Sequence, residues 1–365
     1  MGFNVEKLFN EVLDPRIVGR CDHKLCDILF IALCTFICNG EDYGDMELFG
    51  NERYDWLKSH LELPNGIPSK FTFERTFSTI SPQSLAEVLE GEGANFVKDL
   101  MSKQICIDGK KLKGSSPKSK GNSGIYLLNA WVAEDKICIG QSRIGTKKNE
   151  ITEIPKLLEN LSIEGAIISI DAIGTQTAIV EQIIEQKADY FLALKKNQKH
   201  TLEYIEDSFF LEKTAFINEE WEYDHGRFET RKCSVLSIDN TKSPILEKWK
   251  YLKTLIKIEA ARDIKGKKSK QNRYYLSSIS STNAAYFNQL ARKHWGIENH
   301  LHWHLDVSFS EDKCRCRKGY APENLALFRK IALQRTSRIE DKLSIKKRRY
   351  KASLNNQYLE KILLI

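Results

Sequence analysis

The sequence predicts an α/β protein in which a mixed β-sheet is flanked by helices, with a helical domain before the sheet and a β-rich insertion within it. Three observations support this fold class. Apolar residues recur at helical spacing over residues 1–100, short apolar strands alternate with amphipathic helices from Gln104 to Gln198, and helical spacing returns after Asn283. Residues 201–280 are less regular and strand-rich, so we interpret them as an insertion before the final helix.

The N-terminal region has the pattern of a compact helical domain. Lys24–Cys38 is almost entirely apolar, which is typical of a buried helix, and its apolar run is shorter than the roughly 20 residues that a membrane span requires. Asp45–Leu61 is amphipathic, and Ser81 followed by Pro82 marks the start of a further helix. Because the chain begins without an export signal and has an odd number of cysteines, nine, we expect a cytoplasmic protein with reduced thiols and no membrane contact.

The sheet region begins at Gln104. In chain order we expect strands at 104–108, 125–133 and 137–144, a helix after Asn149, a strand at 166–171, a helix at 177–186 and a strand at 190–194. Two of these strands end on an acid, Asp108 and Asp171, and a glycine-containing turn follows each acid.

These two acids are candidates for a metal site. The carboxyl ends of strands in an open α/β sheet converge, so Asp108 and Asp171 would lie close together. Clustered carboxylates repel each other, and Mg²⁺, which prefers hard oxygen ligands and retains waters, relieves that repulsion. An aspartate after a strand is also a common turn former, so the matched pair, more than either residue alone, favours a site.

A third acid lies on the helical pattern after Asn283. At helical spacing His294, Glu298 and His302 lie one turn apart on one face, with Asp306 only partly rotated from it. The pattern fits a helix that packs on the sheet beside a polar site. It fits equally well an exposed ladder of histidines and acids, so spacing alone leaves the role of Glu298 open.

Charge adds a weaker signal. The net charge is +7, and basic residues gather at Arg262–Arg273 and Lys342–Lys351. Such clusters can neutralise backbone phosphates of a nucleic acid. Taken alone, the two clusters are better explained as a solvated loop and a solvated tail.

Six ordered segments resemble the H-repeat-associated group of insertion-sequence transposases, and the resemblance is collinear from Asp14 to Gln334. The segments are IDGKKLKGS (107–115), KKNEITEIPKLLENL (147–161), SIDAIGTQ (169–176), ADYFLALKKNQ (188–198), HGRFETR (225–231) and HWGIENHLHWHLDVSFSEDKCR (294–315).

The resemblance implies an RNase H-like catalytic core with the acidic triad Asp108, Asp171 and Glu298 as catalytic residues and metal ligands. The implied chemistry is Mg²⁺-dependent phosphoryl transfer with two ions, for which Mn²⁺ can substitute. The enzyme would cleave transposon DNA ends and join them to target DNA. Its partners would be the terminal inverted repeats and the target, with a homodimer on DNA. The alternatives are a stand-alone nuclease of the same fold and a catalytically inactive or domesticated DNA-binding relic.

The sequence patterns, with which the resemblance agrees, give the expected domain boundaries. A helical domain that binds DNA ends would span 1–100, the core 101–200, the β-rich insertion 201–280, the final core helices 281–335 and a basic C-terminal tail 336–365.

DNA contacts are expected beside the acids and on the insertion. Related transposases often carry Tyr, Arg and Lys around the third acid, where this chain has Ala291, His294 and Leu305, so phosphate contacts must come from other side chains. A second departure is Lys70-Phe71, where the group usually has His-Asp. The candidate DNA-binding residues are Lys110, Lys111, His225, Arg227, Arg292, His294, Lys313 and Arg315.

Overall fold

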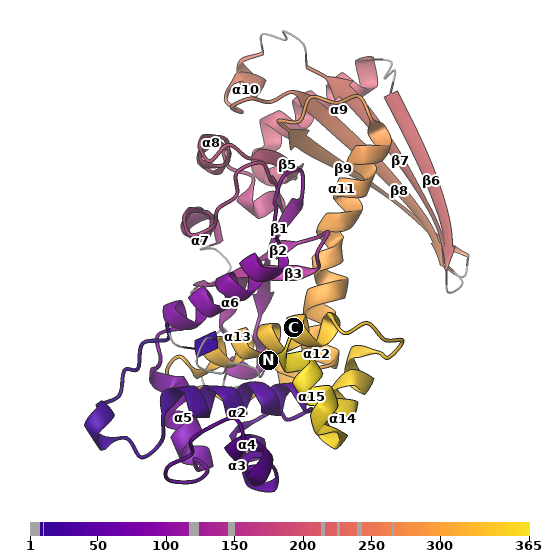
Figure 1. The fold of residues 1–365 in the computed structure, drawn as a ribbon. Helices are drawn as coiled ribbons and strands as arrows, with labels where there is room; N and C mark the ends of the chain where they lie inside the picture. The colour runs from indigo at the N-terminus through magenta and orange to yellow at the C-terminus, as the bar shows by residue number, and fades with distance from the viewer. Residues whose placement is uncertain are drawn as a thin grey trace.

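The computed structural model describes residues 8–9, 11–116, 124–144, 150–212, 216–224, 227–238, 243–264 and 266–365. In Figure 1 a large sheet occupies the upper part of the molecule and a body of helices the lower part. The long helix α11 (Ala284–Ile297) runs beside the sheet toward the helical body and so connects the two parts (Figure 1).

The sheet confirms the predicted mixed α/β class. Its first five strands lie in the order β3-β2-β1-β4-β5, with β4 and β5 parallel to β1, and with β2 antiparallel to both of its neighbours, β1 and β3. They are β1 (Gln104–Lys111), β2 (Tyr126–Val132), β3 (Ile137–Ile144), β4 (Ile167–Ile170) and β5 (Asp189–Leu194). The central strand β4 is buried throughout, as expected for a parallel strand covered on both faces.

Helices cover the two faces of this sheet. Apolar side chains of α7 (Glu150–Glu159) and α8 (Thr177–Glu185) share a core cluster with Ile107 and Ile170 of the strands. The other face lies against α11, since the thiol of Cys106 donates to the carbonyl oxygen of Lys293 at 3.6 Å. Strand alternation therefore directs Cys106, Asp108 and Lys110 toward α11.

The insertion extends the same sheet. Strand β9 pairs antiparallel with β5, and the order continues β9-β8-β7-β6 to give nine strands. The elements are α9 (Lys199–Leu211), β6 (Phe216–Asp224), β7 (Arg227–Ser237), α10 (Pro244–Glu247), β8 (Thr254–Ile264) and β9 (Lys267–Ser277). The basic cluster Arg262–Arg273 is therefore the β8–β9 hairpin, a different structure from the solvated loop that its composition suggests.

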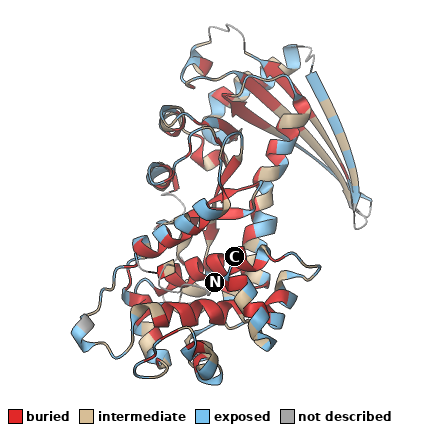
Figure 2. Cartoon of the chain, viewed as in Figure 1, coloured by how far each residue is buried: buried red, intermediate tan, exposed pale blue. Residues whose placement is uncertain are grey.

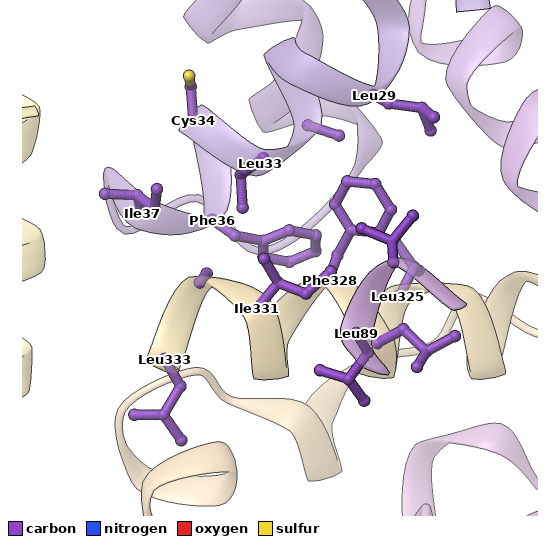
Figure 3. Close-up of a cluster of buried hydrophobic side chains, with 14 of the residues drawn as sticks. Leu29, Leu33, Cys34, Phe36, Ile37, Leu89, Leu325, Phe328, Ile331 and Leu333 are labelled. Atoms are coloured by element: carbon purple, nitrogen blue, oxygen red, sulfur yellow. The ribbon is translucent and has the colours of Figure 1, made fainter. Parts of the chain in front are cut away.

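The helical body has its own core. The elements are η1 (Val18–Arg20), α2 (Leu25–Ile37), α3 (Tyr43–Glu52), α4 (Tyr54–Lys58), α5 (Lys70–Thr79), α6 (Pro82–Phe96), α12 (Trp303–Val307) and α13 (Ala321–Ser337). Figure 3 shows Leu33 and Phe36 of α2 facing Phe328 and Ile331 of α13. Each such side chain contributes about 1.5–3 kcal/mol on burial, and Figure 2 shows how completely α2 and α13 are buried.

The C-terminal segment is folded, whereas the sequence suggests a basic tail. It forms α14 (Ile345–Leu354) and α15 (Asn356–Leu363), which pack on the helical body. Arg349 is fully buried, and its guanidinium donates to the carbonyl oxygens of Phe36 at 2.9 Å, Gly40 at 3.3 Å and Ser308. A buried arginine satisfied in this way serves packing and leaves nothing for a nucleic acid. Over the described residues, every helix is too short or too polar to span a bilayer.

Candidate active site

Asp108 lies within β1, facing the helix α11. The sequence predicts that the strand ends on Asp108, but β1 continues to Lys111 because its pairing with β2 continues to Lys111 opposite Tyr126. Asp108 is paired in register with Asn129 of β2, so the two side chains share a face of the sheet.

Asp171 and Glu298 come from neighbouring elements. Asp171 follows β4 directly, and its Oδ1 accepts a hydrogen bond from the backbone N–H of Ile173 at 3.0 Å, which opens the short 3₁₀ turn η5 (Ala172–Gly174). Glu298 begins the π-helical turn η7 (Glu298–His302), which joins α11 to α12. Single π turns inside α-helices are rare and frequent at functional sites.

The strand register places Asp108 beside Asp171, because Ile107 of β1 lies opposite Ile170 of β4. The pKa of Asp108 is raised to about 7. Burial is the largest cause, and the negative charges of Asp171 and Glu298 also contribute. A histidine lies beside Asp108: Nδ1 of His302 is 3.5 Å from Oδ2 of Asp108. Burial and the charge of Lys110 lower the pKa of His302 to about 3, so it is neutral at neutral pH and does not balance the acids.

This donor set fits a hard divalent cation. It consists of carboxylate oxygens, and Oδ1 of the buried Asn129 beside Asp108 has no hydrogen-bond partner among the described residues. Mg²⁺ takes few protein ligands and retains waters. Within the described part of the chain, no three histidine, cysteine or acidic side chains are already gathered closely enough to chelate an ion, so the acids would draw together on binding.

Lys110 has a different environment from the one expected. Its ammonium lies 2.5 Å from Oδ1 of Asp306 and forms a second ion pair with the buried carboxylate of Glu311. Burial favours the neutral form of Glu311, but Lys110, Lys330 and Arg329 outweigh it and hold the pKa of Glu311 below its ordinary value. Lys110 is thus an internal ion-pair partner and is not presented to a phosphate.

His294 is also internal. Its Nδ1 lies 3.0 Å from Oγ of Ser169 on β4, and burial lowers its pKa to about 4. Because the buried ring hydrogen-bonds a strand of the sheet, His294 joins α11 to β4 and is not presented at the surface.

The other candidate DNA-binding residues lie at the surface or outside the described side chains. Lys111 holds its ammonium 5.5 Å above the ring of Tyr126, and Arg292 pairs with Glu222 at 2.9 Å. Lys313 and Arg315 are exposed beside a cavity of about 500 Å³ that Lys70 and Phe71 also line. His225 lies outside the described residues, as does the side chain of Arg227 at the start of β7.

Two site residues received no role from the sequence. His302 lies on the predicted face of the helix, four residues after Glu298, and that spacing was the available signal. Asn129 lies in a strand of mostly apolar residues, and a polar residue at an inward position of such a strand was the signal for it.

The comparisons with known proteins identify the family of the chain. The family model described as "Transposase DDE domain" matches residues 100–334. The chain belongs to this DDE transposase family. A second model, described as "DDE_Tnp_1-associated", matches residues 7–91.

Two relatives align with nearly the full length of this transposase. The chain is 36% identical over 360 residues to "Putative transposase YncI" of Escherichia coli O157:H7, covering 96% of this chain and 92% of the relative. It is 35% identical over 363 residues to "H repeat-associated putative transposase YhhI" of Escherichia coli K12, covering 96% and 95%. A solved piggyBac transposase synaptic complex with hairpin DNA aligns over 98% of this chain and 80% of its own, with 14% identity and a TM-score of 0.46, which is too low to support an argument.

The two family models follow one another along the chain. The first model covers the N-terminal helices, and the second covers the sheet, the inserted strands and most of α13. The chain is therefore an insertion-sequence transposase with the RNase H-like fold class that its sequence predicts. Helices α14 and α15 lie beyond both matches.

Proposed function

We propose that this transposase cleaves the DNA ends of its element and joins them to target DNA in a reaction that depends on divalent metal ions. Asp108, Asp171 and Glu298 would hold the metal, two Mg²⁺ ions or Mn²⁺ in their place. The observation that carries the proposal is the strand register that sets Asp108 beside Asp171, with Glu298 close enough for its charge to raise the pKa of Asp108. When bound, the metal ions activate the attacking hydroxyl and stabilise the leaving oxygen.

The surrounding residues would hold these acids in place. The N–H of Ile173 restrains the Asp171 carboxylate, and the neutral ring of His302 packs against Asp108. His294 ties α11 to β4 one helical turn before Glu298, which fixes the height of Glu298 above the sheet. Phosphoryl transfer depends chiefly on positioned charge, so rigidity of this kind contributes directly to the rate.

DNA would approach from the side where the exposed cations lie. Arg292 borders the cavity that contains Glu298, which supports it as a DNA contact. We also propose Lys111, Lys313, Arg315, Arg227 and His225 as contacts, to the terminal inverted repeats or to the target. Joining two ends requires two active sites, so the active form would be a homodimer on DNA in the bacterial cytosol.

The test uses the purified transposase, Mg²⁺ and a duplex that carries the terminal repeat of the element, with a plasmid target. The expected products are cut ends and strands joined to the plasmid. Cutting without joining, in repeated assays with saturating target, would instead identify a nuclease. Binding without cutting in either Mg²⁺ or Mn²⁺ would identify an inactive DNA-binding relic.

A further inference from the structure

A cavity lies between α11 and the inner face of the inserted strands. Its volume is about 750 Å³, and Glu298 lies in its wall. Six basic side chains also line it, namely Lys136, Arg231, Arg262, Arg273, Arg292 and Lys293. A cavity of this size matches a small-molecule site and is too small for a duplex, but one or two nucleotides of a single strand would fit.

Strand alternation places the arginines here. Neighbouring strands β7, β8 and β9 each direct one arginine to the inner face: Arg231, Arg262 and Arg273. Guanidinium groups bind phosphates through two parallel hydrogen bonds, so three of them on adjacent strands form a surface suited to a phosphodiester backbone.

Most of these arginines are held by carboxylates. Arg292 lies 2.9 Å from Glu222 and 3.7 Å from Glu220, both on the edge strand β6. Arg231 lies 3.8 Å from Glu222 and 2.9 Å from Glu229. Since Arg292 and Glu222 are each close to half-exposed, their pairing is weak, and a competing anion can replace it.

Arg273 is held differently. Its guanidinium lies 4.6 Å from the ring centroid of Trp295 and donates to Oε1 of Gln271 at 3.0 Å. No carboxylate lies within 4.0 Å of it among the described residues. Trp295 is one turn before Glu298 on α11 and 38% exposed, so a base can stack beside this arginine.

We propose that this cavity binds a short single-stranded segment of DNA next to the cleavage point, with Arg273 and Trp295 as its main contacts. On entry, the phosphates of the strand replace the β6 carboxylates as partners of Arg231 and Arg292. Strand β6 thus acts as an internal competitor that DNA must displace. The inference rests on the proposed function, because it places the cut strand at Glu298.

The first experiment measures binding in EDTA, by fluorescence anisotropy, of a terminal-repeat duplex with a short single-stranded overhang. Arg273→Gln should weaken binding roughly five- to tenfold and reduce the slope of log K against log salt by about 0.7. Arg273→Lys should retain the salt slope. Lys270→Gln removes the same charge from the outer face of the same strand and should leave both quantities unchanged. Equal effects of Arg273→Gln and Lys270→Gln, with both proteins retaining the wild-type Tm, would overturn the proposal.

The second experiment tests the competition. Glu222→Gln should tighten binding of the same probe about threefold, because Arg292 and Arg231 then lack their competitor. Glu219→Gln, on the outer face of β6, is the matched control and should not change the affinity. If Glu222→Gln binds no more tightly than Glu219→Gln, the role of β6 is wrong.

A wild-type assay separates the two levels of failure. If the wild-type transposase neither binds nor cuts terminal-repeat DNA, the proposed function fails. If it cuts that DNA while Arg273→Gln matches its control, only the assignment of the cavity fails.

Discussion

Two groups of acidic side chains lie at the face of β1 that meets the final helices, and they differ in how their charge is balanced. Asp108 meets Asp171 and Glu298, and the mutual repulsion contributes to a pKa of about 7. Two residues further along the strand, Lys110 meets Asp306 and Glu311 and forms an ion pair with each. The two groups are neighbours in the fold, but the first has like charges that repel one another and the second has its charges paired with a lysine.

This difference in charge balance indicates that the paired group has a structural role and that the unpaired group is the candidate site. A buried acid that is paired, like Glu311, is held in one geometry and contributes to the packing of the turn after α12 against the sheet. Acids that are gathered without a partner cost stability, and such an arrangement is characteristic of sites that bind a cation or react. This contrast favours Glu298 over Asp306 as the third acid, a choice that helical spacing left open.

The largest expected effect comes from breaking the paired group. Lys110→Met should lower the free energy of unfolding by about 3–5 kcal/mol, because it leaves Glu311 buried and charged without its nearest partner. Urea denaturation measures this. Lys113→Met is the matched control, since Lys113 pairs with Asp312 but is 72% exposed, and it should cost less than about 1 kcal/mol. Equal losses in the two variants would show that Lys110 is not a buried structural partner.

The next effect is the pH dependence of stability that His294 causes, because its buried ring is neutral at neutral pH. Its folded pKa of about 4 lies below the ordinary value of 6.5, so the unfolded chain takes up the proton first as pH falls. The stability that His294 contributes is therefore complete above pH 6.5 and is lost as pH falls through 4. Between pH 6.5 and pH 4 the free energy of unfolding of the wild type should fall by about 2–3 kcal/mol more than that of His294→Gln. Glutamine is the chosen replacement because its amide can still hydrogen-bond Ser169. Parallel pH profiles for the two proteins would contradict this.

The smallest expected effect comes from removing one charge from the group formed by Asp108, Asp171 and Glu298. In EDTA at pH 8, Asp108→Asn should raise the free energy of unfolding by about 1–2 kcal/mol, because it removes a buried charge that Asp171 and Glu298 repel. Mg²⁺ should raise the Tm of the wild type and have little effect on the variant. Thermal unfolding with and without Mg²⁺ measures both effects, and a destabilised Asp108→Asn would contradict the account.

The sequence predicts the core elements well because their patterns are local. The alternation and apolar runs of β1 to β5 come from faces that are buried on one or both sides, and the apolar helix α2 is buried as its composition indicates. Strands β6 and β9 are harder to predict, since Glu219–Glu222 and Lys267–Arg273 show polar residues on both faces. Their backbone hydrogen bonds, which composition does not reveal, determine that they are strands.

Some residues of the candidate site are likewise predictable from local sequence, and others are not. The position of Asp171 after an apolar strand is a local pattern, so the sequence predicts it. The pairing of Lys110 is not local, because its partners Asp306 and Glu311 lie 196 and 201 residues away. A lysine beside a candidate catalytic acid suggests a phosphate contact, and only the fold shows that two carboxylates already bind it. The same holds for Arg349, whose three carbonyl partners come from distant segments.

The most direct test of the central claim compares Glu298→Gln with Asp306→Asn in one assay. Both variants would be incubated with the terminal-repeat duplex and Mg²⁺, and the rate of strand cleavage measured beside DNA binding in EDTA. The account predicts that Glu298→Gln loses roughly a hundred- to a thousandfold in rate with binding unchanged, whereas Asp306→Asn stays within about tenfold of wild type. An active Glu298→Gln beside an inactive, folded Asp306→Asn would contradict it and move the third acid to the paired group.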